Sequence, residues 1–336
     1  MSTSKQPFNI AIAGYGWWGQ HIARRLQNHD EIGVQYIIEP NTAHHDTIKE
    51  SGFTPLTELS EALEKESVHG VILTTPNPLH EEQVTACATA GKHVFCEKPL
   101  GLTAASAKRS VQACVDAGVQ LGIGHERRFE PALVELKQSI KDGSMGTIMH
   151  AEAAFSHDKL INVPAGDWRT SKAVSPAAGM TAMGIHLTDL LISFFGPAKT
   201  VQAITADRSL GWETGDVVTV QLGFEAGMTA TLSAVLHTPH FIRMHVFGTQ
   251  KWKEVLNDTH PDTPGGVVRM ITAETGQPQD IKQFEWNDAV LENLEAFVDA
   301  AKGRKGYSFT HTEMIHNIEL LEAIAQSAEN GETIHL

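Results

Sequence analysis

Apolar residues in the first 125 positions occur either as short continuous runs or at helical spacing. The runs predict buried strands at Phe8–Ala13, Val34–Ile38, Val71–Thr75, His93–Cys96 and Val119–Gly124. Helical spacing, first seen at Trp18, Ile22 and Leu26, predicts helices between the strands, with later ones around Leu56–Glu66, His80–Ala90 and Thr103–Ala117. This alternation predicts an α/β fold with a doubly wound parallel sheet, the Rossmann architecture.

After about Glu126 the pattern changes to longer segments, several of which alternate apolar and polar residues. Such alternation predicts an open, mostly antiparallel sheet with one covered face. The predicted strands are Thr147–Phe155, Thr200–Ala206, Val217–Phe224, Met228–Val235 and Phe241–Phe247, and the predicted helices are Pro131–Lys141, Ala289–Lys302 and Glu313–Glu329. We therefore expect a Rossmann dinucleotide-binding domain at 1–125 and an α+β substrate-binding and oligomerisation domain at 126–336.

The second sheet also bears on oligomeric state. Few predicted helices are available to cover both of its faces, and an exposed apolar sheet face is usually an interface. We expect a homodimer or homotetramer, with the strands in 217–235 as the contact surface.

Composition narrows the class of protein. The chain has 336 residues, is 41% hydrophobic and carries a net charge of −14. An acidic surface repels phosphate backbones, so we expect no nucleic-acid partner. The sequence has no run of 18 apolar residues, so we expect no membrane span. The N-terminus is polar and lacks the apolar core of a signal peptide. The three cysteines, Cys87, Cys96 and Cys114, have no metal-site spacing, which favours a cytoplasmic protein with reduced thiols and no metal site.

A glycine-rich turn follows the first predicted strand and opens the first predicted helix. Gly14 allows the tight turn, Gly16 lets a pyrophosphate approach the N–H groups at the helix N-terminus, and Gly19 allows close packing of helix on strand. The pattern in this context is the dinucleotide-binding fingerprint. Its cofactor-binding candidates are Gly14, Tyr15, Gly16, Trp17, Trp18 and Gly19.

An acid at the end of the second strand predicts which dinucleotide binds. Glu39 comes twenty residues after Gly19, and a carboxylate there accepts hydrogen bonds from ribose hydroxyls while repelling a 2′-phosphate. No arginine or lysine follows until Lys49. We expect NAD as the cofactor in preference to NADP, the alternative being that Glu39 is an exposed acid without this role.

The next two strands end in polar segments at the carboxyl edge, where such sheets bind ligands. The first segment supplies the cofactor candidates Thr75, Pro76, Asn77 and His80, and the second supplies Glu97 and Lys98. An ammonium group beside a substrate hydroxyl stabilises a developing alkoxide and can hold its proton. Lys98 is therefore a catalytic candidate, with a surface lysine as the alternative, and Glu97 either pairs with it or faces another charge.

His186 and Asp189 lie three residues apart and share one face of a predicted helix. A histidine is suited to take a hydroxyl proton near neutral pH, which makes His186 the second catalytic candidate. The alternative is a buried histidine with a structural hydrogen bond.

Taken together, these motifs resemble the glucose–fructose oxidoreductase, inositol dehydrogenase and rhizopine-catabolism (Gfo/Idh/MocA) family. The glycine turn, Thr-Thr-Pro-Asn with its following histidine, Glu-Lys-Pro and Gly-x-His-x-x-Asp occur in the family's order, with Trp168-Arg169 before the last motif. The resemblance implies NAD(P)-dependent oxidation of a sugar, polyol or related ring alcohol. It also implies that Lys98 and His186 are the catalytic pair. The substrate-binding candidates are Lys98, His125, Arg127, Trp168, Arg169, Lys172, His186 and Asp189.

One position departs from the family pattern. The residue four before His186 is Ala182, where the family typically has an aspartate beside the histidine. Lys172, Asp167 or the segment His125-Glu126-Arg127 is available as a substitute, and the sequence does not choose among them. Because an imine needs a proton donor and no alcohol base, reduction of an imine or another unsaturated small molecule is an alternative function. A non-catalytic NAD-binding regulator, like the galactose-pathway transcriptional repressor, is a third.

Overall fold

We describe a computed structural model of the chain, which covers residues 7–164 and 166–336. Contacts divide it into two compact units. The first runs to Gly124 and also includes Val290–Ile315, and the second comprises His125–Ala289 and His316–Leu336. The domain bounds 1–125 and 126–336 remain a prediction, from which the contact units differ in the segment 290–315.

The first unit is built on a parallel sheet of strand order β3-β2-β1-β4-β5-β6, which confirms the predicted Rossmann architecture. All of its strand pairs are parallel. The strands are β1 (Phe8–Ala13), β2 (Ile32–Ile38), β3 (Thr54–Leu56), β4 (Gly70–Leu73), β5 (His93–Cys96) and β6 (Leu121–Ile123). The helices are α1 (Trp17–Leu26), α2 (His45–Glu50), α3 (Leu59–Leu63), α4 (His80–Thr89), α5 (Ala104–Ala117) and α8 (Ala289–Ala301).

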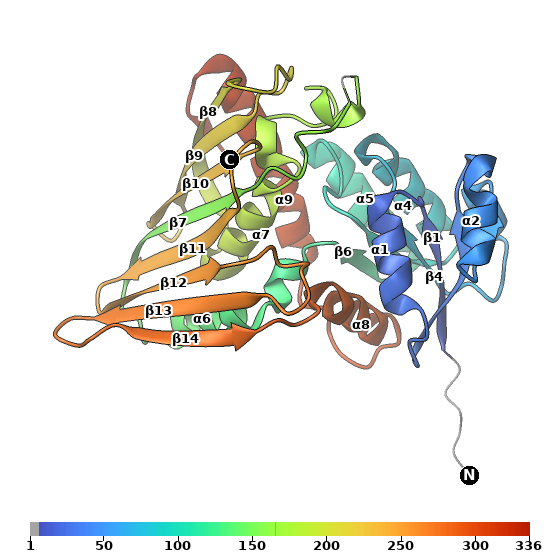
Figure 1. The fold of residues 1–336 in the computed structure, drawn as a ribbon, viewed down its shortest axis with the longest axis horizontal. Coiled ribbons are helices and arrows are strands. Elements are labelled where there is room, and N and C mark those ends of the chain that lie inside the picture. The colour runs from blue at the N-terminus through green and yellow to red at the C-terminus, as the bar shows by residue number, and fades with distance from the viewer. Residues whose placement is uncertain (1–6, 165) are drawn as a thin grey trace, which may run out of the picture. The chain divides into compact units, whose positions relative to one another are not determined.

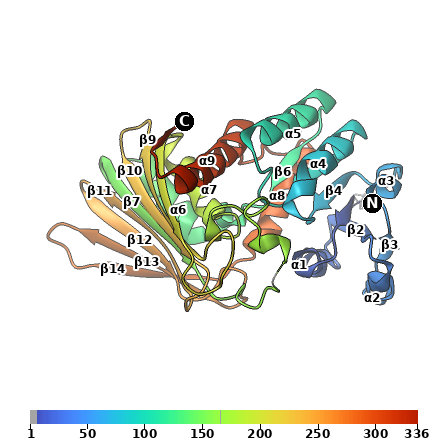
Figure 2. The same cartoon turned by 90° about the horizontal axis from the view of Figure 1, so that it is seen from above.

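Helices cover both faces of this sheet. Figure 2 shows α4 and α5 on one side and α1 on the other. On the side of α1, the buried Ile22 and Leu26 belong to one hydrophobic cluster with Leu294 and Phe297 of α8. Phe297 meets Phe95 of β5 edge to face, with the ring centroids 5.6 Å apart. A helix from late in the sequence therefore completes a core that the first 124 residues begin.

Helix α5 shows how local chemistry sets the ends of an element. The side chain of Thr103 accepts a hydrogen bond from the Ser106 N–H, and Ser106 reaches back to the Thr103 N–H, which is a capping box. At the other end Gly118 has φ of 65°, the left-handed conformation that glycine adopts without strain. Both ends of this helix agree with the sequence prediction.

The second unit is built on a nine-stranded sheet of order β14-β13-β12-β11-β7-β10-β9-β8-β15 (Figure 1). Every pairing in it is antiparallel except that of β10 with β7, so the predicted mostly antiparallel sheet is confirmed. Its strands are β7 (Ile148–Ser156), β8 (Ala198–Ala206), β9 (Val217–Phe224), β10 (Thr229–Val235), β11 (Phe241–Gly248), β12 (Lys251–Asn257), β13 (Val267–Glu274), β14 (Asp280–Glu285) and β15 (Ile334–His335).

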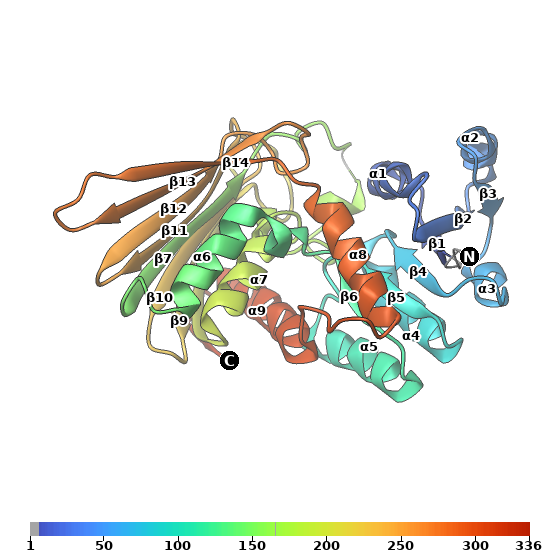
Figure 3. The same cartoon turned by 90° about the horizontal axis from the view of Figure 1, so that it is seen from below.

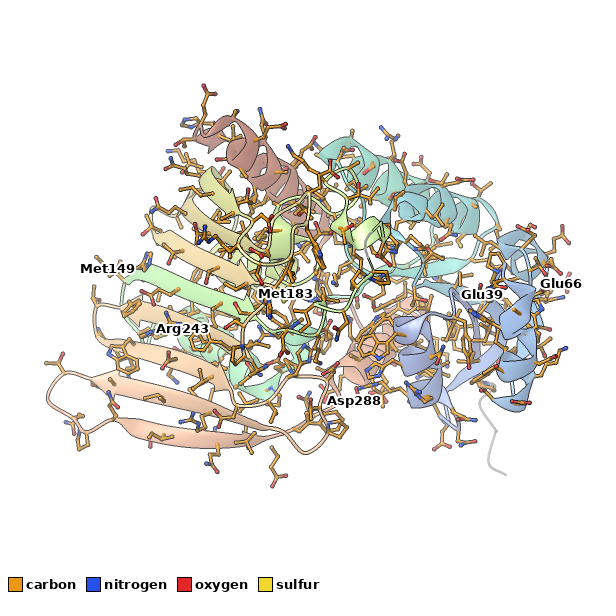
Figure 4. The ribbon with its side chains drawn as sticks, turned by 45° about the horizontal axis from the view of Figure 1, so that its top comes forward. Glu39, Glu66, Met149, Met183, Arg243 and Asp288 are labelled. Carbon is orange, nitrogen blue, oxygen red and sulfur yellow. The ribbon has the colours of Figure 1, made fainter. Side chains whose placement is uncertain are left out.

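Helices α6 (Pro131–Lys141) and α7 (Gly184–Phe195) lie on one face of this sheet (Figure 3). Helix α9 (His311–Asn330) is tied to β8, since Ser327 Oγ accepts a hydrogen bond from the Ala203 N–H. Side chains that face the helices, such as Met244 and Val246 of β11, are fully buried. Arg243, which precedes Met244 on β11 (Figure 4), ion-pairs with Glu152 and Glu254 on the neighbouring strands.

Two stretches were predicted wrongly. The helix expected around Leu56–Glu66 is only Leu59–Leu63, and the preceding residues form α2 and the edge strand β3, neither of which was predicted. Strands β12, β13 and β14 were not predicted, because their partly exposed residues blur the alternation that marks a half-buried strand.

Two further observations concern the described part of the chain. Cys87, Cys96 and Cys114 are buried free thiols, and burial raises the pKa of Cys87 and of Cys114 to about 12. None of the helices combines the length and the apolar character that a membrane crossing requires.

Candidate active site

The glycine turn in the first unit has the geometry that a bound pyrophosphate needs. Gly14 has φ of +93°, and its backbone N–H donates to Ile38 O. A Cβ on Gly19 would lie 2.1 Å from Gly14 O, whereas a Cβ on Gly16 would meet nothing within 4 Å. The absence of a side chain at Gly19 therefore allows α1 to pack closely against the turn after β1, while Gly16 leaves open space at the N-terminus of α1. Because the first turn of α1 has no acidic residue, these residues fit an anionic group there.

Glu39, labelled in Figure 4, is held beside this turn in the first unit by hydrogen bonds. Its two carboxylate oxygens accept hydrogen bonds from the backbone N–H groups of Tyr15 (3.2 Å) and Asn41 (2.9 Å). Each carboxylate oxygen can accept a further bond. The acid therefore has a defined position next to the glycine turn, as a ribose-binding residue requires.

His80 links the two polar segments at the carboxyl edge. Its side chain is fully buried, and its ring nitrogens contact Thr75 O at 2.9 Å and Pro99 O at 2.6 Å. Burial lowers the pKa of His80, against the opposing effect of the two carbonyl contacts. His80 therefore holds the loops after β4 and β5 in place from inside the protein.

Other cofactor candidates differ in their exposure. Trp17 is 62% exposed, whereas Tyr15 and Asn77 are buried. Trp18 is half-buried, Pro76 is exposed, and Thr75 donates a hydrogen bond to Gln83.

Lys98 follows β5, and its side chain is half-buried. Its backbone N–H donates to Glu97 Oε2 at 3.3 Å, and its peptide bond to Pro99 is cis. Burial raises the pKa of Glu97 to about 7, while the Trp18 indole and the Lys98 charge favour the carboxylate. A Cβ on Gly124 would lie 2.4 Å from Glu97 Oε2, so glycine at that position makes room for the acid.

His186 occupies the first turn of α7 in the second unit and is 6% exposed. Its Nδ1 lies 3.5 Å from His125 Nδ1 and 3.8 Å from Glu126 Oε2. The two imidazole rings meet at 90°, with their centroids 5.3 Å apart. Of the substitutes considered for the acid absent at Ala182, the structure therefore brings the segment beginning at His125 to His186.

Asn317 of α9 extends this group of polar side chains. Its Nδ2 lies 3.1 Å from His125 Nε2 and donates to Ile185 O at 3.3 Å. Its Oδ1 accepts a hydrogen bond of 2.6 Å from the Thr188 hydroxyl. Asn317, His125 and Thr188 are all buried, so this network is shielded from water. We call Glu126, His125, His186, Thr188 and Asn317 the histidine network.

Two substrate candidates lie in buried ion pairs. Asp189 accepts two hydrogen bonds of 2.7 Å from Arg128, and both side chains are buried. Arg127 is 1% exposed and binds Glu130 and Asn257. These contacts join the segment after Gly124 to α7 and to β12, and they anchor the two arginines that directly follow His125 and Glu126.

The other substrate candidates lie outside the histidine network. Trp168 and Arg169 belong to one short 3₁₀ turn, in which the guanidinium lies 4.3 Å from the indole ring and pairs with Asp167. Lys172 pairs with Glu329 of α9 at 2.9 Å. Asp167 and Lys172, considered as substitutes for the missing acid, are thus engaged with other residues.

Sequence reasoning missed Asn317 and a group of rings around Phe155. The Phe155 ring lies 6.0 Å from that of His186 and 5.7 Å from those of His157 and His260. Burial lowers the pKa of His157 to about 4, so its ring is neutral near pH 7. Asn317 lies 131 positions after His186, and nothing in its local sequence marks it. The described residues contain no group of three or more side chains arranged to hold a metal ion.

Comparison with known proteins gives the family. Residues 8–125 match the model described as "Oxidoreductase family, NAD-binding Rossmann fold", and residues 133–253 match the "GFO/IDH/MocA C-terminal domain". The first match confirms the predicted NAD-binding Rossmann domain.

Two relatives illustrate the range of names. The chain is 31% identical to 4-carboxy-2-hydroxymuconate-6-semialdehyde dehydrogenase of Sphingobium sp. (strain NBRC 103272 / SYK-6), over 67% of this chain and 70% of that protein. It is 30% identical to scyllo-inositol 2-dehydrogenase (NADP(+)) IolW of Bacillus subtilis (strain 168), over 64% of this chain and 59% of that protein. The matched share of a relative's length varies widely, from 38% in one case to 94% in another.

A solved structure supports the fold. The aldose-aldose oxidoreductase from Caulobacter crescentus, complexed with glycerol, superimposes with a TM-score of 0.86 at 22% identity, covering 98% of this chain and 100% of that one. With both domain models matched in order along the chain, this protein belongs to the GFO/IDH/MocA family of NAD-binding oxidoreductases.

Proposed function

We propose that this protein oxidises a secondary alcohol of a sugar, polyol or related ring compound, with NAD as the hydride acceptor. The observation that carries the proposal is the polar support of His186. Although Ala182 cannot supply an acid, His125 and Glu126 lie within 4 Å of His186 Nδ1. Imine reduction was considered because Ala182 replaces the family's aspartate. The polar neighbours of His186 make that alternative unnecessary.

The cofactor half of the proposal rests on the first unit. The open space at Gly16 admits a pyrophosphate, and Glu39 is positioned to accept hydrogen bonds from an adenosine ribose. A 2′-phosphate beside that carboxylate would be repelled. We therefore propose NAD in preference to NADP, although the inositol dehydrogenase relative is named for NADP.

Lys98 and His186 are proposed to carry out two tasks, proton transfer and stabilisation of the alkoxide. NAD, when bound, accepts the hydride from the carbinol carbon. Lys98 follows a strand of the NAD-binding fold, and the neighbouring Glu97 is held mostly protonated below pH 7 by burial. A neutral Glu97 adds no negative charge next to Lys98, so positive charge that forms on the Lys98 amine during proton transfer can stabilise an alkoxide.

The substrate class follows the names of relatives. An inositol dehydrogenase is among the sequence relatives, and an aldose–aldose oxidoreductase is among the structural ones. Both names describe polyhydroxylated molecules with secondary alcohols. A small molecule of that kind is the proposed partner of the site.

The experiment is a screen of cyclic polyols and aldoses with NAD, followed by the absorbance of the reduced nicotinamide. The proposal expects turnover of at least one member by the wild-type protein and its loss in His186→Ala. A general acid or base contributes about 10²–10⁴ to rate. Turnover of imines in the reverse direction with no polyol oxidation would support a reductase, and NAD binding without any turnover would support a regulator.

A further inference from the structure

The contacts within the histidine network determine which ring nitrogens carry protons, and the orientation of the Asn317 amide is the starting point. One end of the Asn317 amide lies 3.3 Å from Ile185 O, and the other end meets the Thr188 hydroxyl at 2.6 Å. A carbonyl oxygen only accepts hydrogen bonds. The end of the amide that faces Ile185 must therefore be the NH₂ group, because an amide oxygen there would leave two acceptors opposed.

The same NH₂ group faces His125. Its Nδ2 lies 3.1 Å from His125 Nε2, and because the NH₂ group only donates, His125 Nε2 must accept. A neutral imidazole carries one proton, so the proton of His125 lies on Nδ1. If both nitrogens of His125 carried protons, its Nε2–H would face the N–H of the Asn317 amide.

His125 Nδ1 lies 3.5 Å from His186 Nδ1. With a proton on the His125 nitrogen, His186 Nδ1 is the acceptor of this contact. We propose that Asn317, acting through His125, holds His186 as the neutral tautomer with its proton on Nε2, so that His186 acts on the substrate as a hydrogen-bond donor. Asn317 and His125 are then positioning residues that take over the orienting role of an acid at position 182.

This inference rests on the proposed function and decides between the two tasks left open there. A neutral imidazole that donates from Nε2 polarises a reacting oxygen and stabilises an alkoxide. It cannot also take the hydroxyl proton at that nitrogen. In alcohol oxidation the hydroxyl proton must go to another base, and the neutral amine of Lys98 is the group that the chain offers: the O–H bond breaks and the N–H bond of an ammonium forms.

Glu126 offers a competing arrangement. Its Oε2 lies 3.8 Å from the same His186 Nδ1, which is longer than a hydrogen bond. If Glu126 were the partner, His186 would carry its proton on Nδ1, and the Nδ1–H of His125 would face another N–H. The shorter contact and the fixed amide of Asn317 favour the Nε2 tautomer.

The test is a nuclear magnetic resonance experiment on the wild-type protein with isotopically labelled histidine nitrogens. Long-range proton–nitrogen correlations identify which ring nitrogen carries the proton, and the spectra of His186→Gln and His125→Gln assign the two rings. We expect His125 protonated on Nδ1 and neutral His186 protonated on Nε2. A His186 ring protonated on Nδ1 in the wild-type protein overturns the proposal.

Two variants sharpen the experiment. An aspartate in Asn317→Asp accepts where the amide donates, so the proton of His125 should move to Nε2 and that of His186 to Nδ1. Turnover should then fall by about 10²–10³, the usual cost of one lost donor to an oxyanion. Glu126→Gln is the control, in which both tautomers should stay as in the wild type; a changed His186 tautomer in this variant contradicts the proposal.

The readout separates this inference from the proposed function. The wild-type spectrum needs no substrate, so it is decisive even if Asn317→Asp fails to fold. An Nε2 tautomer in a protein that oxidises no polyol would refute the function and keep the inference. Polyol oxidation by a protein whose His186 is protonated on Nδ1 would support the function and refute the inference.

Discussion

Lys98 and His186 stand in differently built surroundings. Lys98 is next to Glu97, whose own surroundings come from residues close to strand ends of one parallel sheet, Trp18 and Gly124. The surroundings of His186 come from three distant segments, 125–126, the first turn of α7 and the middle of α9. The first is set by the order of strands in a Rossmann sheet, whereas the second depends on how α9 returns to α7 within its unit.

Glu97 beside Lys98 and Glu126 near His186 differ in the same way. Glu97 is 7% exposed, and its burial raises its pKa to about 7. The side chain of Glu126 is 17% exposed and 3.8 Å from His186. A buried acid close to neutrality responds to pH, while a partly solvated acid beyond hydrogen-bond distance acts only through its charge. Substitution of Glu97 should therefore change how stability depends on pH, whereas substitution of Glu126 should have only a small effect on turnover.

Among Lys98, Glu97, Glu39 and Glu126, the largest effect is expected at Lys98. Lys98→Met should lower turnover by about 10²–10³, because one electrostatic stabiliser of the reacting oxygen is lost, while the Kd for NAD should stay within about threefold of the wild type. Lys92→Met is the control, since the Lys92 ammonium binds the backbone oxygens of Lys65 and Val68 and should leave turnover unchanged. If Lys98→Met keeps more than about a tenth of wild-type turnover in a chemistry-limited assay, Lys98 is structural.

Glu97 should make stability depend on pH. The folded protein holds the Glu97 proton up to about pH 7, against 4.5 for an ordinary glutamate. Its contribution to the free energy of unfolding is therefore full below pH 4.5 and is lost as pH rises through 7, by about 3 kcal/mol at most. Relative to the wild type, Glu97→Gln should gain stability over this range in urea unfolding. Parallel curves for the two proteins would show that Glu97 is not held protonated.

Glu39 should set the choice of cofactor. Glu39→Ser removes an acid with two backbone hydrogen bonds beside the glycine turn, and should weaken NAD binding by about 1.5–3 kcal/mol. The gap between NAD and NADP should narrow, because the charge that repels a 2′-phosphate is gone. Titrations of both cofactors measure this, with the exposed Glu66 (Figure 4) as the matched Glu66→Ser control. Equal or tighter binding of NADP by the wild type would contradict the assignment.

The smallest effect is expected at Glu126. Since its carboxylate is beyond hydrogen-bond distance of a neutral His186, Glu126→Gln should change turnover by less than about tenfold, or 1.4 kcal/mol. Steady-state rates beside those of His186→Ala measure this. A loss as large as that of His186→Ala would make Glu126 the residue that replaces the missing acid.

The same contrast explains what could be read from the sequence. The places of the glycine turn, Glu39 and Lys98 in the fold were predictable, because parallel strands bring their carboxyl ends to one edge of the sheet and chain order then gives position. His186 was predictable as a motif, but its partners were not. Asn317 looks like any polar residue of an amphipathic helix, and only the packing of α9 brings it to His125. Likewise α8 belongs to the core of the first unit through Phe297 and Leu294, which no local pattern announces.

The most direct test of the proposed function follows the hydrogen that the reaction moves. A polyol or aldose found by the screen is prepared with deuterium on the carbinol carbon and incubated with the protein and NAD, and the reduced cofactor is analysed by mass spectrometry. The account predicts that the deuterium appears on the nicotinamide ring, together with a ketone or lactone product. Deuterium that stays with the product, or exchanges into water while NAD is unchanged, would contradict oxidation by hydride transfer.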